Sequence, residues 1–117
     1  MQTTKLSPLT SRVRFGLARV DITPPVGIYH RMWGASRHDR STGVHKPLLA
    51  DVMAIGPSKD AAPGLLCAQV DLVQLTQDQH DELLSALSVA SGVPAEGTVV
   101  AYSHTHAAGW FKLDRVG

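Results

Sequence analysis

The sequence has few cysteines and little net charge. It has a single cysteine, Cys67, so it cannot form an internal disulfide, and the apolar neighbours of Cys67 favour a buried small side chain over a reactive thiol. Eleven basic residues against ten acidic ones leave a formal charge of +1, without a basic stripe. We therefore expect no nucleic-acid partner, because such binding needs many Lys and Arg side chains that face phosphates.

Long hydrophobic runs are also missing. The apolar stretch 65–75 is interrupted by Gln69, Asp71 and Gln74, whereas a membrane span needs roughly 18 to 20 apolar residues in succession. The first sixteen residues contain no continuous apolar segment of the signal-peptide type. We expect no transmembrane segment and a cytoplasmic location by default, or secretion if the true N-terminus differs. Oligomeric state is left open by the sequence.

The remaining composition is that of an ordinary folded domain, with 44% hydrophobic and 18% charged residues. Residues 1–14 are polar and aperiodic, and we interpret them as a flexible lead-in. Residues 15–117 then form one partial domain. The chain ends with little left to close a sheet, which we interpret as truncation.

Apolar runs of strand length occur at 15–22, 48–55, 65–73 and 98–103. A helix is predicted over 77–91, with Thr76 and Gln79 forming a capping box, and with Gly92 and Pro94 ending it. This order of elements predicts an α/β fold, a mixed sheet with a flanking helix, as a fragment of a larger domain. The polar segment 29–46 is long for a loop, which indicates function or disorder.

Two histidines, His104 and His106, follow the last predicted strand. In an extended backbone the side chains at i and i+2 point to the same side, so both imidazoles can face one site. Imidazole is the commonest metal ligand, and a catalytic zinc usually takes three protein ligands and keeps a fourth position for water. Such a zinc lowers the pKa of its water and polarises a carbonyl, which allows attack on an amide.

The spacing of the pair also fits other interpretations, since two histidines at a strand end can be solvated or locally hydrogen-bonded. A site like that of the metallo-β-lactamases calls for Asp-His soon after the pair, where this chain has Ala107-Ala108-Gly109. An amidohydrolase barrel normally places such a pair on its first strand. Neither class fits well.

The residues around the pair match a known pattern at five places in the same order. They are DITPPVG at 21–27 with Trp33-Gly34, GVHKPL at 43–48, VDL at 70–72, SGVP at 91–94 and SHTH at 103–106. This pattern resembles the opening of the neutral/alkaline non-lysosomal ceramidase family, over roughly residues 16–106. The resemblance places the chain in the N-terminal part of that family's catalytic domain.

The resemblance implies a zinc-dependent hydrolase of an N-acyl, ceramide-like amide, with one Zn²⁺ and a small-molecule or lipid substrate. In the family the first histidine of His-Thr-His is a zinc ligand, which implies that role for His104. The second lies beside the metal and assists at the scissile amide, which implies a catalytic role for His106. The other family ligands, a His, a Glu and a Tyr, lie downstream, so the resemblance implies an inactive isolated chain with an incomplete site.

Substrate identity is left open because the sequence departs from the family at Ala107-Ala108-Gly109-Trp110, where members usually continue Ser-Gly-Pro. The alternative from another class is a small non-catalytic α/β domain that binds a partner or a stray metal through a His-rich surface.

Other polar and aromatic residues have plainer interpretations. His80 falls on the leucine stripe of the predicted helix, which favours a structural role. Asp21 and Asp71 are favoured as turn caps over acceptors for a metal-bound imidazole. Trp33 is favoured as a packing residue over the floor of a substrate groove. His45 is left open between loop anchoring and site lining, and His30 and His38 are interpreted as solvated.

Overall fold

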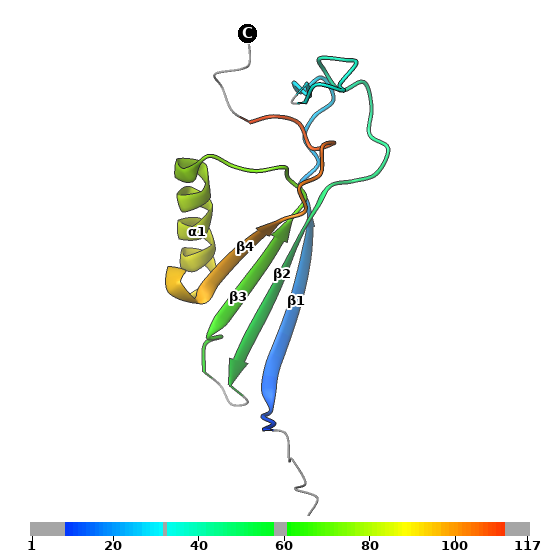
Figure 1. Cartoon of the computed structure of the whole chain (residues 1–117). Coiled ribbons are helices and arrows are strands. Elements are labelled where there is room, and N and C mark those ends of the chain that lie inside the picture. Colours follow the sequence, from blue (N-terminus) through cyan, green and yellow to red (C-terminus); the bar gives the residue numbers. More distant parts are fainter. Residues whose placement is uncertain (1–8, 32, 58–60, 112–117) are drawn as a thin grey trace, which may run out of the picture.

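The structure is a computed structural model that describes residues 9–31, 33–57 and 61–111. It consists of a four-stranded sheet with α1 (Gln77–Ser91) on one side (Figure 1). The strands are β1 (Val13–Asp21), β2 (Leu49–Pro57), β3 (Leu65–Val70) and β4 (Thr98–Tyr102), and a short 3-10 turn (Ala95–Gly97) precedes β4. Within the described residues, no helix is long and apolar enough to cross a membrane.

The sheet has the strand order β1-β2-β3-β4 and is mixed. The pairs β1–β2 and β2–β3 are antiparallel, and β3–β4 is parallel. A parallel pair needs a crossover connection, and α1 provides it between β3 and β4. The predicted fold class, a mixed sheet with a flanking helix, is confirmed.

Local capping fixes both ends of α1. The backbone N–H of Gln79 donates to the Thr76 hydroxyl at 3.3 Å, and the Thr76 N–H donates to the Gln79 side chain at 3.0 Å. At the other end Gly92 has a φ of 74°, a left-handed conformation that glycine adopts without steric cost. The helix therefore spans the predicted residues.

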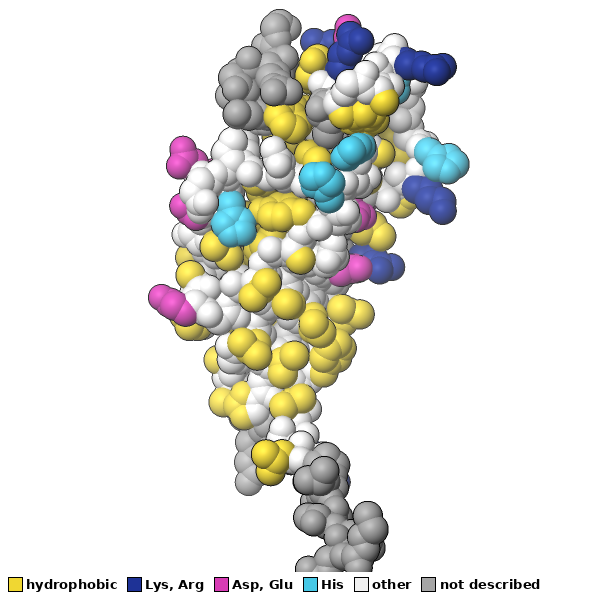
Figure 2. Space-filling view, in the orientation of Figure 1, with side chains coloured by type: hydrophobic (Ala, Val, Ile, Leu, Met, Phe, Trp, Pro, Cys, Tyr) yellow, Lys and Arg dark blue, Asp and Glu magenta, His cyan; other side chains and the backbone are white. Residues whose placement is uncertain are grey.

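One face of the sheet forms the core. Leu66, Ala68 and Val70 alternate along β3 as buried residues, and the Tyr102 side chain on the same face bonds to α1. The opposite face carries Phe15 and Leu17, which are 62% and 69% exposed. Figure 2 shows hydrophobic side chains gathered at the surface over the sheet. Because apolar sheet faces are stable only when covered, this face is a candidate for association.

The loops that follow β1, β3 and β4 meet at one end of the sheet (Figure 1). Backbone bonds join them there: His104 N donates to Leu72 O at 3.0 Å, and Trp110 N donates to Tyr29 O at 2.9 Å. Strand β3 ends at Val70, three residues before its predicted end, because the Leu72 N–H turns back to the Val70 carbonyl at 2.9 Å.

Candidate metal and catalytic site

The histidine pair lies in the loop beyond β4. His104 has a φ of 57°, so the backbone is left-handed there, and the expectation of an extended backbone through the pair is wrong. The turn nevertheless brings the two rings together. The ring centroids of His104 and His106 are 5.3 Å apart, with 65° between the ring planes. The pair therefore shares one site through a turn rather than through strand alternation.

His104 is anchored to the segment that follows β3. Its backbone N–H bonds to Leu72 O at 3.0 Å, and its Nδ1 atom lies 3.0 Å from the carbonyl oxygen of Val73. A carbonyl oxygen only accepts hydrogen bonds, so Nδ1 carries the proton and donates it. In the neutral ring the lone pair then resides on Nε2. Metal-binding histidines commonly have this arrangement, with the second nitrogen held by a carbonyl or carboxylate.

His106 lies against Trp33. The centroids of these rings are 4.6 Å apart, with 34° between their planes. The ring centroids of Trp33 and His30 are 5.8 Å apart, and the ring of His30 stacks on that of His38 with the centroids 5.0 Å apart. Trp33 thus joins the loop after β1 to the loop of the pair, and the contacts found are with loop residues, not with the sheet.

The interpretation of His30 as simply solvated is wrong, whereas His38 is exposed as interpreted. The two rings stack within 18° of parallel, and the Nδ1 atom of His30 is buried without a hydrogen-bond partner among the described residues. An antiparallel bridge pairs Tyr29 with Arg40, next to the two stacked imidazoles. His38 remains exposed at the outer end of this stack.

Both aspartates hold backbone groups. Asp21 accepts a hydrogen bond from Thr23 N at 2.8 Å, and bonds from the hydroxyl and then the backbone of Thr23 lower the pKa of Asp21. Asp71 accepts from Leu49 N at 2.9 Å and so fixes the start of β2. The turn-capping interpretation is confirmed for Asp21. Asp71 likewise accepts from a backbone N–H, that of Leu49.

His80 has the structural role favoured by its place on the helix. Its Nδ1 atom lies 2.6 Å from the hydroxyl oxygen of Tyr102 and links α1 to β4. Burial raises the pKa of Tyr102. His45 lies on the wall of a cavity in the long loop, together with Thr105. This cavity is not lined by His104 or His106, so both interpretations of His45 stay open.

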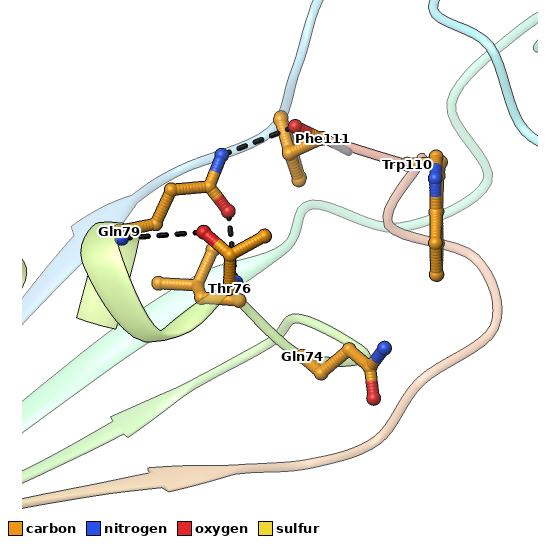
Figure 3. A pocket seen from close by; sticks show the side chains of 6 residues that line it. Gln74, Thr76, Gln79, Trp110 and Phe111 are labelled. Carbon is orange, nitrogen blue, oxygen red and sulfur yellow. Dashed lines mark hydrogen bonds between the residues drawn. The ribbon is translucent and has the colours of Figure 1, made fainter. Parts of the chain in front are cut away.

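An apolar cavity of about 330 Å³ lies at the start of α1 (Figure 3). The aromatic residues Trp110 and Phe111 line it, and the Gln79 side chain holds Phe111 by donating to its carbonyl oxygen at 3.1 Å. In Figure 3 Trp110 stands across the cavity from Gln79. Gln74 also lines the cavity, and it directly follows Val73, whose carbonyl oxygen holds the His104 ring.

His104 and His106 are the two possible metal ligands that this loop brings together. In the ranges that the structure describes, no group of three His, Cys, Asp or Glu side chains is placed to hold one metal ion. His104 and His106 can thus supply at most part of the three protein ligands that a catalytic zinc takes.

The chain is similar to known proteins in its three-dimensional structure. No family model and no curated protein sequence matches the chain. A ceramidase complexed with C2 is similar, with a TM-score of 0.68 and 28% sequence identity over 84% of this chain. The neutral ceramidase from Pseudomonas aeruginosa is similar over the same share, with a TM-score of 0.67 and 28% identity.

The chain is similar in fold and sequence to these neutral ceramidases. It spans 15% and 16% of the lengths of these two ceramidases, so it corresponds to part of a larger fold. The family resemblance inferred from the five sequence landmarks is confirmed.

Two features of the site around His104 and His106 were missed by sequence reasoning. Val73 contributes only a backbone oxygen to His104, and no side-chain pattern marks such a role. Gly109 has a φ of 86°, and a Cβ atom there would lie 2.9 Å from Cδ1 of Ile28. The glycine itself was the available signal, because only glycine fits a left-handed backbone packed this closely.

Proposed function

We propose that this chain is the part of a zinc-dependent amide hydrolase that supplies His104 as a metal ligand and His106 as the neighbouring catalytic residue. The observation that carries the proposal is the bond from His104 Nδ1 to Val73 O, which turns Nε2 into the available ligand atom. The fold of two ceramidases, one of them complexed with C2, supports an N-acyl, ceramide-like substrate.

A bound zinc supplies a Lewis acid that polarises an amide carbonyl. The chain's own contribution is to hold the two imidazoles. His104 is fixed by two bonds to residues 72–73, so its ring is oriented before any metal binds. His106 is exposed and lies between the rings of His104 and Trp33, where it can exchange a proton with a substrate nitrogen or oxygen.

The apolar cavity beside Val73 supports an acyl substrate. Leu75, Trp110 and Phe111 give it an apolar lining, and its volume of about 330 Å³ is within the range of small-molecule pockets. Each methylene group buried in such a cavity contributes about 0.8 kcal/mol. We assign this cavity to the first carbons of the acyl chain. The isolated chain is expected to be inactive, because its described residues do not complete a zinc site.

A segment exchange tests the proposal. The matching segment of the Pseudomonas aeruginosa neutral ceramidase is replaced by residues 9–111 of this chain, and zinc content and cleavage of a short N-acyl substrate are measured. We expect activity that falls about 10²- to 10⁴-fold in His106→Ala, the usual size of an acid–base contribution. His104→Ala should also lose zinc, and His80→Ala, which alters a structural histidine, should retain it.

Retention of both zinc and activity in the His104→Ala chimera contradicts the proposal. A chimera that folds and binds zinc normally but cleaves no N-acyl substrate favours the alternative, a non-catalytic binding domain. Circular dichroism of each chimera separates these results from misfolding.

A further inference from the structure

A second cavity of about 330 Å³ lies between the loop that joins β1 to β2 and the loop that follows β4. Thr105 and Ala107 line it, whereas His104 and His106 do not. Its walls are rich in hydrogen-bond donors, which come from Ser41, Thr42, Lys46 and three histidines, His30, His38 and His45. No aspartate or glutamate is among the described residues that line this cavity.

We propose that this cavity, which we call the loop cavity, binds a small oxyanion, a carboxylate or a phosphate group. The Lys46 ammonium has three N–H donors and no acceptor, and neither an ion pair nor a hydrogen bond of Lys46 is found within the described residues. The Ser41 hydroxyl oxygen accepts from Gly27 N at 2.9 Å, which leaves its own proton to donate. Each neutral imidazole adds one N–H donor.

The charges around the loop cavity also favour an anion. Arg40 lies on the same loop and donates to Gly27 O at 3.0 Å, so its guanidinium is held close to the cavity wall formed by Ser41. Of the neighbouring carboxylates, Asp39 is paired with Arg31 at 3.1 Å. Asp21 accepts from Thr23 N and keeps its negative charge, but it does not line the cavity. Opposite charges near an anion raise its local concentration and its affinity.

The apolar part of the wall strengthens these interactions. Pro24, Ile28 and Leu48 line the loop cavity together with the donors. Hydrogen bonds to a charged acceptor are about twice as strong as neutral ones, and they gain further where water is partly excluded. The site needs neither His104 nor a metal. Hydrolysis of an amide releases a carboxylate, and the loop cavity can bind this carboxylate beside Thr105. This assignment of the ligand rests on the proposed function.

Nuclear magnetic resonance of the ring signals of the histidines tests the site on the chain itself. Acetate, inorganic phosphate and the neutral analogue acetamide are titrated separately at constant ionic strength. We expect saturable shifts of the His30, His38 and His45 signals with acetate, phosphate or both, and the two salts show which oxyanion is preferred. Equal shifts with acetamide overturn the proposal, since they show that the charge of the ligand is not recognised.

Variants of the chain locate the site. Lys46→Gln removes the cavity's ammonium and should weaken binding about tenfold, the size expected for one charge-assisted hydrogen bond. Arg37→Gln removes a charge from the same loop outside the cavity lining and should leave binding within about twofold. Equal effects of the two variants, with unchanged helix signals in circular dichroism, contradict the proposal.

The His104→Ala variant separates this site from the proposed zinc site. Binding of the oxyanion should survive in His104→Ala even though zinc binding is lost. Loss of oxyanion binding in that variant overturns the claim that the loop cavity is a separate site.

Discussion

The Nδ1 atom of His104 lies 3.0 Å from the carbonyl oxygen of Val73, across 31 residues of sequence. This bond joins the loops that follow the two parallel strands, β3 and β4. Ligand sites in α/β sheets commonly form at the carboxyl ends of parallel strands, where such loops meet. The bond therefore explains why an imidazole from one loop is presented in a fixed orientation at this end of the sheet.

Trp33 should hold His106 in place. Trp33→Ala removes the ring that lies 4.6 Å from His106 and should lower the free energy of unfolding by about 0.5–1.5 kcal/mol beyond the lost apolar area. Trp33→Phe keeps a ring at this position and should recover part of the loss. Urea unfolding gives the free energies, and the ring signals of His106 should broaden in Trp33→Ala only. Unchanged His106 signals in Trp33→Ala contradict this role.

Gly109 should tolerate no side chain. Gly109→Ala places a Cβ atom 2.9 Å from Cδ1 of Ile28 on a backbone with a φ of 86°, and it should cost more than about 1 kcal/mol of stability. Gly43→Ala is the matched control in the long loop, because a Cβ atom there meets nothing within 4 Å. Thermal unfolding of both variants, and of Gly109→Ala with Ile28→Ala, checks the clash. If Ile28→Ala gives no relief, the cost comes from the backbone alone.

Acid should weaken the Arg19–Asp51 pair across β1 and β2, where two bonds of 2.6 and 2.8 Å join the side chains. The hydrogen bond from Arg19 is the main cause that lowers the pKa of Asp51 below its ordinary value of 3.8. A carboxyl group with a lowered folded-state pKa stabilises the fold above its unfolded pKa, and this contribution is lost as pH falls through the folded pKa.

Asp51→Asn should therefore destabilise the chain at pH 7 and show a smaller loss of stability between pH 7 and pH 3 than the unaltered chain. Urea unfolding at the two pH values measures the difference. The pair is exposed, so the effect should be small and should shrink at high salt. A pH dependence identical to that of the unaltered chain speaks against the assigned pair.

The uncovered sheet face should cause the isolated chain to self-associate. Leu17 is 69% exposed on β1, next to other apolar residues of the same face, whereas Val89 is 84% exposed on α1. Leu17→Ser should lower the sedimentation coefficient at high concentration and raise solubility, because it interrupts a contiguous apolar patch. Val89→Ser should change little. Equal effects of the two substitutions show that the β1 face is not the associating surface.

The sequence predicts those parts of the structure that depend on local interactions. Helix α1 begins after Thr76 and ends before Gly92 as predicted, because the residues that cap it are its own neighbours. The strands follow from their apolar runs. The left-handed backbone at His104 was not predictable in this way, since its backbone and ring bonds go to Leu72 and Val73, on another loop.

The same reason explains the surroundings of the pair. His30 stacks on His38 next to a bridge between residues far apart in the loop, and the contact of Trp33 with His106 depends on how two loops meet. Neither contact can be predicted from the residues that neighbour these side chains in the sequence. The family resemblance indicated which histidines to consider, and the structure shows what holds them.

Zinc titration of the isolated chain by calorimetry, with His104→Ala and His80→Ala measured beside it, tests whether His104 is a metal ligand. We expect weak binding that His104→Ala abolishes and His80→Ala leaves unchanged, because the Nε2 atom of His104 is available as a ligand in the proposed zinc site and His80 is bonded to Tyr102. Zinc binding of equal strength in the unaltered chain and in His104→Ala would contradict it.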